Sequence, residues 1–368
     1  MLPPPTRYAL LLVFEYRRSA MRADVPNPLL SMSVDLAIAW NLCINRFHIP
    51  RRNITVVTDL RGGPATMFPW EPLHCDDCNP RVRQLSCPDA RAIAREIAQF
   101  TEHTVRGVRE VSKGDVPVDE VFVYISCHGA QIPTPHGDDD TALIFTNSEG
   151  TSRRYLRSSD IFRLLFGNMH IEADGHMVVP IAVRRMISSP GGRPYPQFSD
   201  DSVEFRLLPR ADGDEHRVSR GLPRETRMLV LMDACHSCSM THFEYRFDAA
   251  TREMVMTREP DTNPTPLCVC LSAAQDTCVA PSTSYGSAFT RYMHSILMAR
   301  HAPTTLAQMH GLIYDRLPEI LRRCQPALTA TTPHAHDILP LLMPVPLPID
   351  PGCHCHLCDS HHRCSHST

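Results

Sequence analysis

The stretch Leu231-Met232-Asp233-Ala234-Cys235-His236-Ser237 closes an apolar run that begins at Met228. A short, continuous apolar run of this kind is typical of a strand buried on both faces, as in a parallel sheet. A second run of the same form, over residues 121–126, is followed by Cys127-His128-Gly129. Both runs therefore predict central strands that deliver polar side chains to one edge of a sheet. There a side chain is held rigidly and can still reach a cleft.

A cysteine and a histidine at two strand ends are the groups that thiol-dependent hydrolysis needs. The imidazole of His128 can keep the thiol of Cys235 ionised and can protonate a leaving group. Gly129 has no side chain, so the backbone can approach a bound molecule closely. The alternative for Cys235 taken alone is an inert, buried thiol. His236 follows Cys235 directly and points to a different face, so it is not the expected base.

Strand-like and helical patterns alternate along most of the chain. Predicted helices carry their apolar residues on one stripe, as Ile93, Ile97 and Phe100 do after Pro88. Strands are predicted over residues 8–14, 54–58, 121–126, 142–145, 228–233 and 267–272. This alternation predicts the α/β class, with a three-layer α/β/α sandwich and a mostly parallel central sheet.

Two stretches interrupt the alternation. Residues 167–227 are rich in Pro, Gly and charge and predict an insertion, in which residues 176–186 and 202–208 can pair as a hairpin. Residues 241–266 are polar and predict an exposed linker. The expected organisation is one domain over residues 1–350, formed by parts 1–240 and 267–350 around the linker, followed by a Cys/His-rich tail over residues 351–368.

Composition narrows the possible partners and compartment. A formal net charge of -3 gives no general attraction to nucleic acid. The apolar run over residues 8–14 is too short to span a bilayer and leads into charged residues instead of a cleavage site. The 15 cysteines, an odd number without a secretory signal, fit reduced thiols better than a disulfide framework. We therefore expect a cytoplasmic, globular protein that binds neither nucleic acid nor membranes.

With both strand ends in view, the chain resembles the metacaspases, the arginine/lysine-directed branch of the caspase-like cysteine peptidases, from about residue 7 to about residue 346. One motif that resembles the family is Tyr124-Ile125-Ser126-Cys127-His128-Gly129. Compared with the family motif around the catalytic histidine, it has one extra residue and a cysteine before the histidine. The other is Asp233-Ala234-Cys235-His236-Ser237-Cys238, which departs from the family only at its last position. The motifs around Asp35, Val56-Val57-Thr58-Asp59, residues 272–276 and residues 286–290 follow in family order.

The resemblance implies a caspase-like domain with a large-subunit-like part (1–240) and a small-subunit-like part (267–350), acting as a monomer. It implies that Cys235 attacks the scissile carbonyl and that His128 donates a proton to the departing amine. Backbone N–H groups of Gly129 and Cys235 would hold the oxyanion, a stabilisation of about 3 kcal/mol per donor.

The resemblance also implies a pocket for the side chain that precedes the cut, lined by Asp59, Ser126, Asp233 and Asp276. Carboxylates without a basic partner in their motifs favour a cationic guest, so protein or peptide substrates with arginine or lysine at this position are expected. The alternative for Asp59 and Asp233 is a strand-end cap or a solvated turn carboxylate. Cys127 and Cys238 are either bystanders or a redox lock on the nucleophile.

Many metacaspases are activated by calcium bound through aspartates outside the cleft. Asp140 and Asp160 match two of these ligands, but Ser159 stands where the family has a further aspartate. Calcium activation is therefore open, and the run around Asp140 could equally be a solvated turn. The tail after Pro351 has zinc-type ligands, but its spacing fits no standard finger and favours adventitious or flexible binding over a folded zinc site.

The expected function is that of a cysteine endopeptidase cleaving after Arg or Lys. The linker contains Arg246, Arg252 and Arg258 in polar surroundings, so an enzyme of this specificity could cut itself there. The alternative is a catalytically silent caspase-like scaffold or regulatory binding protein. Two departures from the family favour this alternative: Cys238 at the end of the nucleophile motif, and Ser159 in place of an aspartate of the calcium site.

Overall fold

The computed structural model describes a sheet-centred core and its surrounding elements. The residues described are 6–16, 28–29, 32–60, 79–111, 120–133, 139–151, 153–157, 161, 164–165, 170–171, 177–180, 204–206, 222, 226–238, 243–248, 250–251, 253–257, 267–275, 278–283, 285–299, 305, 308–309, 312–313, 318–331 and 333.

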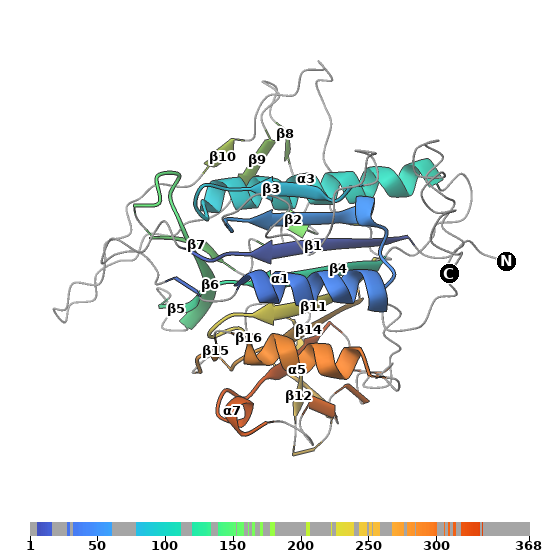
Figure 1. Cartoon of the computed structure of the whole chain (residues 1–368), viewed down its shortest axis with the longest axis vertical. Helices are drawn as coiled ribbons and strands as arrows, with labels where there is room; N and C mark the ends of the chain where they lie inside the picture. Colours follow the sequence, from blue (N-terminus) through green and yellow to red (C-terminus); the bar gives the residue numbers. More distant parts are fainter. Residues whose placement is uncertain are drawn as a thin grey trace, which may run out of the picture.

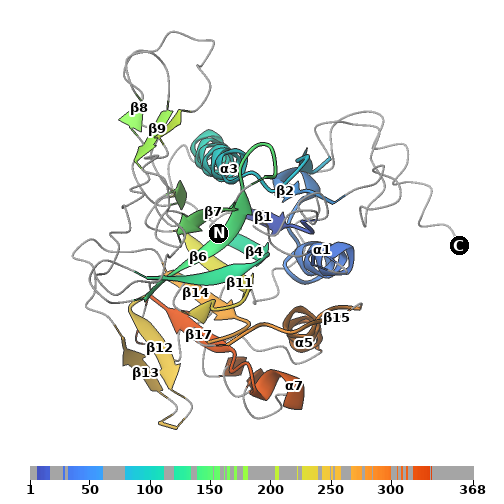
Figure 2. The same ribbon diagram turned by 90° about the vertical axis from the view of Figure 1, so that its left-hand side faces the viewer.

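A nine-stranded sheet forms the centre of the fold, in the order β13-β12-β17-β14-β11-β4-β1-β2-β3 (Figure 1 and Figure 2). The strands from β14 to β3 in this order are parallel, and β17, β12 and β13 extend the sheet in antiparallel pairing. The strand bounds are β1 (Arg7–Val13), β2 (Ile54–Thr58), β3 (Arg81–Gln84), β4 (Glu120–Ser126), β11 (Arg227–Asp233), β12 (Tyr245–Asp248), β13 (Glu253–Met256), β14 (Leu267–Ser272) and β17 (Ala327–Ala330).

Alternate residues of β1 pack into two separate cores, because successive side chains of a strand point to opposite faces. Ala9, Leu11 and Val13 pack with α1 (Met32–Asn41) and α5 (Ala288–Leu297). Leu10 and Leu12 pack on the other face, with α3 (Ala90–Val111). Figure 2 shows α1 and α5 on one side of the sheet and α3 on the other. The predicted class, a three-layer α/β fold with a mostly parallel central sheet, is confirmed.

Smaller elements surround this core. A three-stranded antiparallel sheet packs on the α3 side, and a π-helical turn, η1 (Leu42–Arg46), directly follows α1. The remaining bounds are η2 (Arg51–Asn53), β5 (Gly129–Pro133), β6 (Asp139–Thr146), β7 (Arg153–Arg157), β8 (His170–Ile171), β9 (Met177–Pro180), β10 (Glu204–Arg206), β15 (Ser282–Thr283), β16 (Gly286–Ser287) and α7 (Glu319–Arg322).

Several sequence predictions are confirmed element by element. The strands over residues 54–58 and 267–272 have the predicted bounds. The hairpin predicted within the insertion is present as β9 and β10, and β8 pairs with β9 as a third strand.

Two predictions differ from the structure. The strand over residues 142–145 belongs to the small sheet as part of β6, because the chain turns back after β4 and pairs β5 with β6. The segment over residues 241–266, expected as an exposed linker, contributes β12 and β13 to the central sheet. Phe247 is buried there and anchors β12, while its charged neighbour Arg246 is exposed, so the segment reads as polar in the sequence.

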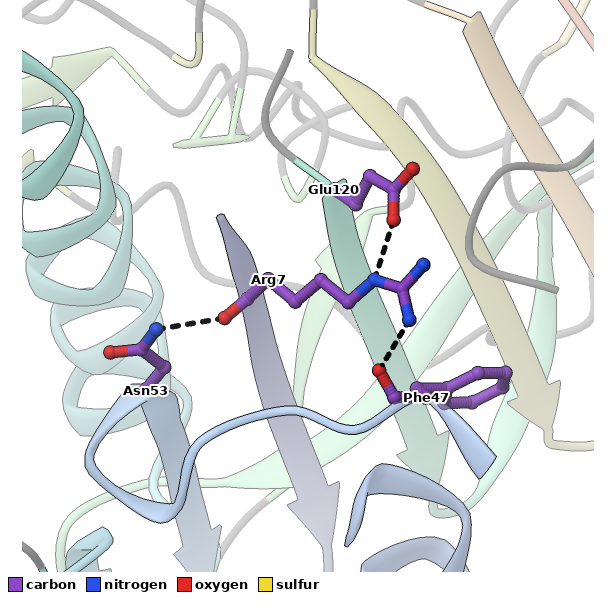
Figure 3. A network of polar contacts seen from close by, with 4 residues as sticks. All are labelled: Arg7, Phe47, Asn53 and Glu120. Atoms are coloured by element: carbon purple, nitrogen blue, oxygen red, sulfur yellow. Dashed lines mark hydrogen bonds and ion pairs between the residues drawn. The ribbon is translucent and has the colours of Figure 1, made fainter. Parts of the chain in front are cut away.

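A buried ion pair connects the amino ends of the central strands (Figure 3). Nε of Arg7 lies 2.7 Å from Oε2 of Glu120, and Nη1 of Arg7 donates to the carbonyl of Phe47 at 2.7 Å. The amide of Asn53 donates to the carbonyl of Arg7 at 2.9 Å. Both charged side chains are almost fully buried, so each compensates the desolvation of the other.

Within the described ranges, no helix has both the length and the apolar composition that crossing a bilayer requires.

Candidate active site

The two candidate catalytic residues follow neighbouring strands at the carboxyl edge of the sheet. β4 and β11 are adjacent and parallel, and Ser126 pairs with Asp233 at their ends. Beyond this pair the N–H of Cys127 still donates to the carbonyl of Asp233, at 3.3 Å. His128 and Cys235 come directly afterwards on the two segments, and both are partly exposed.

A turn carries Cys235 and is tied to the segment that follows β14. His236 has a positive φ of 54° and donates its N–H to the carbonyl of Cys278 at 3.1 Å. The hydroxyl of Ser237 donates to the carbonyl of Ala274 at 3.3 Å. Histidine tolerates this left-handed conformation better than most residues. The cysteine is thus presented by a turn whose next two residues are held by hydrogen bonds.

The pKa of the Cys235 thiol is raised by burial, and the negative charge of Asp233 raises it further, against a backbone hydrogen bond from Ala280. Both effects favour the protonated thiol over the thiolate. A base has to remove its proton before or during attack on a carbonyl.

Tyr16 lies directly against His128. The two ring centroids are 4.8 Å apart, with the planes inclined by 55°. The backbone N–H of His128 donates to the Tyr16 hydroxyl at 3.4 Å, and this hydroxyl donates to the carbonyl of Ile144 at 2.6 Å. Tyr16 is fully buried and has a positive φ of 60°. No local sequence pattern signals the contact between Tyr16 and His128, which follows β4.

Asp233 is buried within a cluster of polar groups. Its carboxylate accepts a short hydrogen bond from the Thr290 hydroxyl, which lies 2.7 Å from the hydroxyl of Tyr124. Because Thr290 donates its single hydroxyl proton to Asp233, Tyr124 is the donor of the second bond. Burial raises the pKa of Asp233, and the Thr290 hydrogen bonds oppose this shift.

Asp35, in the first turn of α1, is a second carboxylate beside Asp233. Burial raises its pKa to about 8, and the charge of Asp233 adds to the shift. Its Oδ1 accepts the N–H of Ser287 at 2.9 Å, and its Oδ2 has no hydrogen-bond partner among the described residues. Two buried carboxyl groups that have no basic partner among the described residues favour the binding of a cation. In the sequence, Asp35 stands out only by its place in the order of the motifs.

Asp59 is also buried, but its contacts differ from those of Asp233. Its two oxygens accept the backbone N–H groups of Glu15 at 2.6 Å and Tyr16 at 2.9 Å. Burial raises the pKa of Asp59 to about 6, against these hydrogen bonds. These hydrogen bonds go to the segment after β1 and not to the Asp35–Asp233 cluster. They correspond to the capping alternative that the sequence left open.

Ser126 and Gly129 lie close to His128 in the chain. Ser126 is buried, and its hydroxyl contacts the sulfur of Met32 at 3.3 Å, beside the start of α1. Gly129 is the first residue of β5. Cys127 is buried, and burial raises the pKa of its thiol, with a further contribution from the nearby thiol of Cys235; Cys270 is affected in the same way by burial and by Cys238.

The remaining predicted site residues are only partly described. Asp140 lies in β6, but its side chain is outside the described part, as are Asp160, Asp276, Arg252, Arg258 and the tail after residue 350. Arg246 is exposed on β12. In the part of the chain that the structure describes, no group of three or more His, Cys, Asp or Glu side chains is placed to hold a metal ion.

Comparison with known proteins gives similarities only among solved structures. No family model matches the chain, and no curated protein matches it. The chain is similar to a protein of Geobacter sulfurreducens at 14% identity and a TM-score of 0.44, covering 93% of this chain and 98% of that one. It is also similar to caspase-1 from Spodoptera frugiperda at 10% identity and a TM-score of 0.38, covering 89% and 87% of the two chains. Similarities this low do not assign a chemistry to the chain.

Proposed function

We propose that the chain is a cysteine endopeptidase that cleaves after arginine or lysine, with Cys235 as nucleophile and His128 as general base and acid. The observation that carries this proposal is the register of β4 and β11. Ser126 pairs with Asp233, so the two reactive side chains follow adjacent strand ends at one edge of the sheet. Rigid strand ends are suited to holding two groups in a reactive geometry.

In the proposed reaction, His128 accepts the thiol proton as the Cys235 sulfur attacks the scissile carbonyl. The tetrahedral oxyanion accepts hydrogen bonds from the backbone N–H groups of Gly129 and Cys235. His128 then donates the proton to the departing amine as the C–N bond breaks. Water attacks the thioester, again with His128 as base, and releases the acid and the free thiol.

The Asp35–Asp233 cluster supports the preference for a basic side chain. Both carboxyl groups are buried at the same place, because Asp35 of α1 accepts the N–H of Ser287 and Asp233 of β11 accepts the hydroxyl of Thr290, and both donors lie at the start of α5. The raised pKa of Asp35 means that a bound guanidinium or ammonium group would favour its ionised form. Aspartate in the same place would add a third carboxyl group and be rejected.

Turnover of fluorogenic peptides tests the proposal. Peptides ending in arginine, lysine or aspartate before the fluorophore are incubated with the wild type, Cys235→Ala, His128→Ala and the control Cys238→Ala. We expect cleavage of the arginine and lysine peptides, a loss of at least about 10³-fold in both active-site variants, and little change in the control. Repeating the assay with added calcium or with a chelator tests whether calcium bound through Asp140 and Asp160 activates the enzyme. If the wild type and Cys235→Ala cleave the peptides at the same rate, the peptidase proposal is rejected in favour of a catalytically silent scaffold.

A further inference from the structure

We propose that Tyr16 and Asp59 are positioning residues for His128, and that Asp59 therefore supports the catalytic step instead of binding the substrate side chain. The inference rests on the proposed function and deepens it. It also reassigns Asp59, which the sequence had placed in the specificity pocket. The contacts of the three residues carry it.

The main chain of His128 is held on both sides. Its N–H donates to the Tyr16 hydroxyl at 3.4 Å, and its carbonyl accepts the N–H of Ile144 at 2.9 Å. The Tyr16 hydroxyl donates to the carbonyl of Ile144 at 2.6 Å. These bonds close a ring through three residues. A shift of the histidine backbone would therefore break hydrogen bonds inside a buried region, where an unpaired polar group is costly.

The side chain of His128 is held as well. The Tyr16 ring lies 4.8 Å from the imidazole, centroid to centroid, and is itself fully buried against the α3 side of the sheet. A buried aromatic ring cannot move aside easily because the core around it is closely packed. Tyr16 thus limits the positions that the imidazole can take.

Asp59 sets the backbone from which Tyr16 projects. A φ of 60° is uncommon for a bulky residue and needs support from its surroundings. Asp59, directly after β2, supplies this support by accepting the N–H groups of Glu15 and Tyr16. The three residues form a connected series across neighbouring strand ends, from Asp59 after β2 to Tyr16 after β1 to His128 after β4.

The first test separates catalysis from binding. Tyr16→Phe keeps the buried ring and removes only the hydroxyl, while Asp59→Asn keeps the shape but replaces one of the two accepting oxygens with an NH2 group that cannot accept a backbone N–H. Tyr8→Phe is the matched control, because Tyr8 is a buried tyrosine at the other end of β1. We expect both test variants to lower kcat about tenfold on arginine and lysine peptides alike, with KM unchanged within about twofold. The control should retain the wild-type kcat.

Either of two results would overturn the proposal. One is a higher KM for arginine peptides with unchanged kcat in Asp59→Asn, which would return Asp59 to the pocket. The other is a wild-type kcat in Tyr16→Phe, with thermal unfolding showing that all variants are folded.

A second readout does not depend on proteolysis. The ring resonances of His128 are titrated by NMR in the wild type and the three variants. We expect Tyr16→Phe and Asp59→Asn to shift these resonances, and Tyr8→Phe to leave them in place. If the wild-type protein shows no turnover that depends on Cys235, the peptidase proposal fails. The titration still tests whether Tyr16 and Asp59 position His128. Identical His128 titrations in all four proteins would reject the positioning role.

Discussion

At the scale of single residues, the resting state of Cys235 decides how the site works. Burial and the neighbouring charge of Asp233 both raise the pKa of the thiol. A preformed thiolate–imidazolium pair would need the opposite shift. The proposed enzyme is therefore one in which proton transfer to His128 accompanies attack on the substrate.

Alkylation of Cys235 without substrate tests this protonation state. Below its pKa a thiol reacts through its small thiolate fraction, so the rate of labelling by iodoacetamide should rise about tenfold per pH unit across the neutral range. Asp233→Asn removes the adjacent negative charge, so it should lower the thiol pKa and speed labelling at neutral pH. Asp248→Asn on β12 is the control and should have no effect. Mass spectrometry of the peptide containing Cys235 measures the rate of labelling. A labelling rate that does not change between about pH 6 and about pH 8 would indicate a depressed thiol pKa and therefore a preformed thiolate–imidazolium pair.

Residue types at strand ends could be predicted from the sequence, but their long-range contacts could not. His128 and Cys235 were found because each follows an apolar run closely. Asp35 contacts Ser287, which is 252 positions away in the chain, and Tyr16 contacts His128 across 112 positions. No local pattern encodes such pairs. Asp59 shows the converse, because the family resemblance implied a place in the pocket while its oxygens accept two backbone N–H groups.

At the scale of elements, the hairpin formed by β12 and β13 shows where sequence patterns fail. β14 was predicted with its observed bounds because it is buried along nearly its whole length and rich in apolar residues. β12 has one buried residue, Phe247, and pairs through Tyr245 with Ala330 of β17, far along the chain. Its charged and exposed residues are typical of a strand near the edge of a sheet. Because the surrounding residues are also polar, the sequence pattern did not distinguish this strand from a linker.

The same hairpin predicts which of the candidate arginines can be cut. Peptidases bind substrates as extended, unpaired backbone, but Arg246 pairs with Val255 on one side and with Thr329 on the other. Cleavage after Arg246 would require β12 to leave the sheet. We therefore expect self-cleavage after Arg252 or Arg258 in preference to Arg246.

Sequencing the new amino termini of fragments from the wild type tests this order, with Cys235→Ala as the uncleaved control. Arg246→Gln should leave the fragment pattern unchanged, whereas Arg252→Gln or Arg258→Gln should remove one product. A main fragment that begins at Phe247 would contradict the prediction and show that β12 detaches.

At the scale of the whole molecule, the two ends of the parallel strands carry different tasks. The carboxyl ends collect the reactive and acidic residues, whereas the amino ends carry the buried pair of Arg7 and Glu120, which joins β1 to β4. Arg227 lies opposite Glu120 on β11 and is a second, weaker source of positive charge for it. The charged pair at one end thus stabilises the fold, while the residues at the other end are the proposed catalytic and pocket residues, so the two groups can be tested separately.

Removing one member of the buried pair should destabilise the fold without changing the site. Arg7→Met leaves Glu120 buried without its main partner and should lower the free energy of unfolding by about 3 kcal/mol. Glu120→Gln should have an effect of similar size, and the double variant should lose less than the sum of the two, by at least about 1 kcal/mol. Arg83→Met is the matched control, because the Arg83 side chain that pairs with Glu96 is 58% exposed, and it should cost less than about 1 kcal/mol. Urea unfolding measures these values, and additive single effects would mean that the two charges do not stabilise one another.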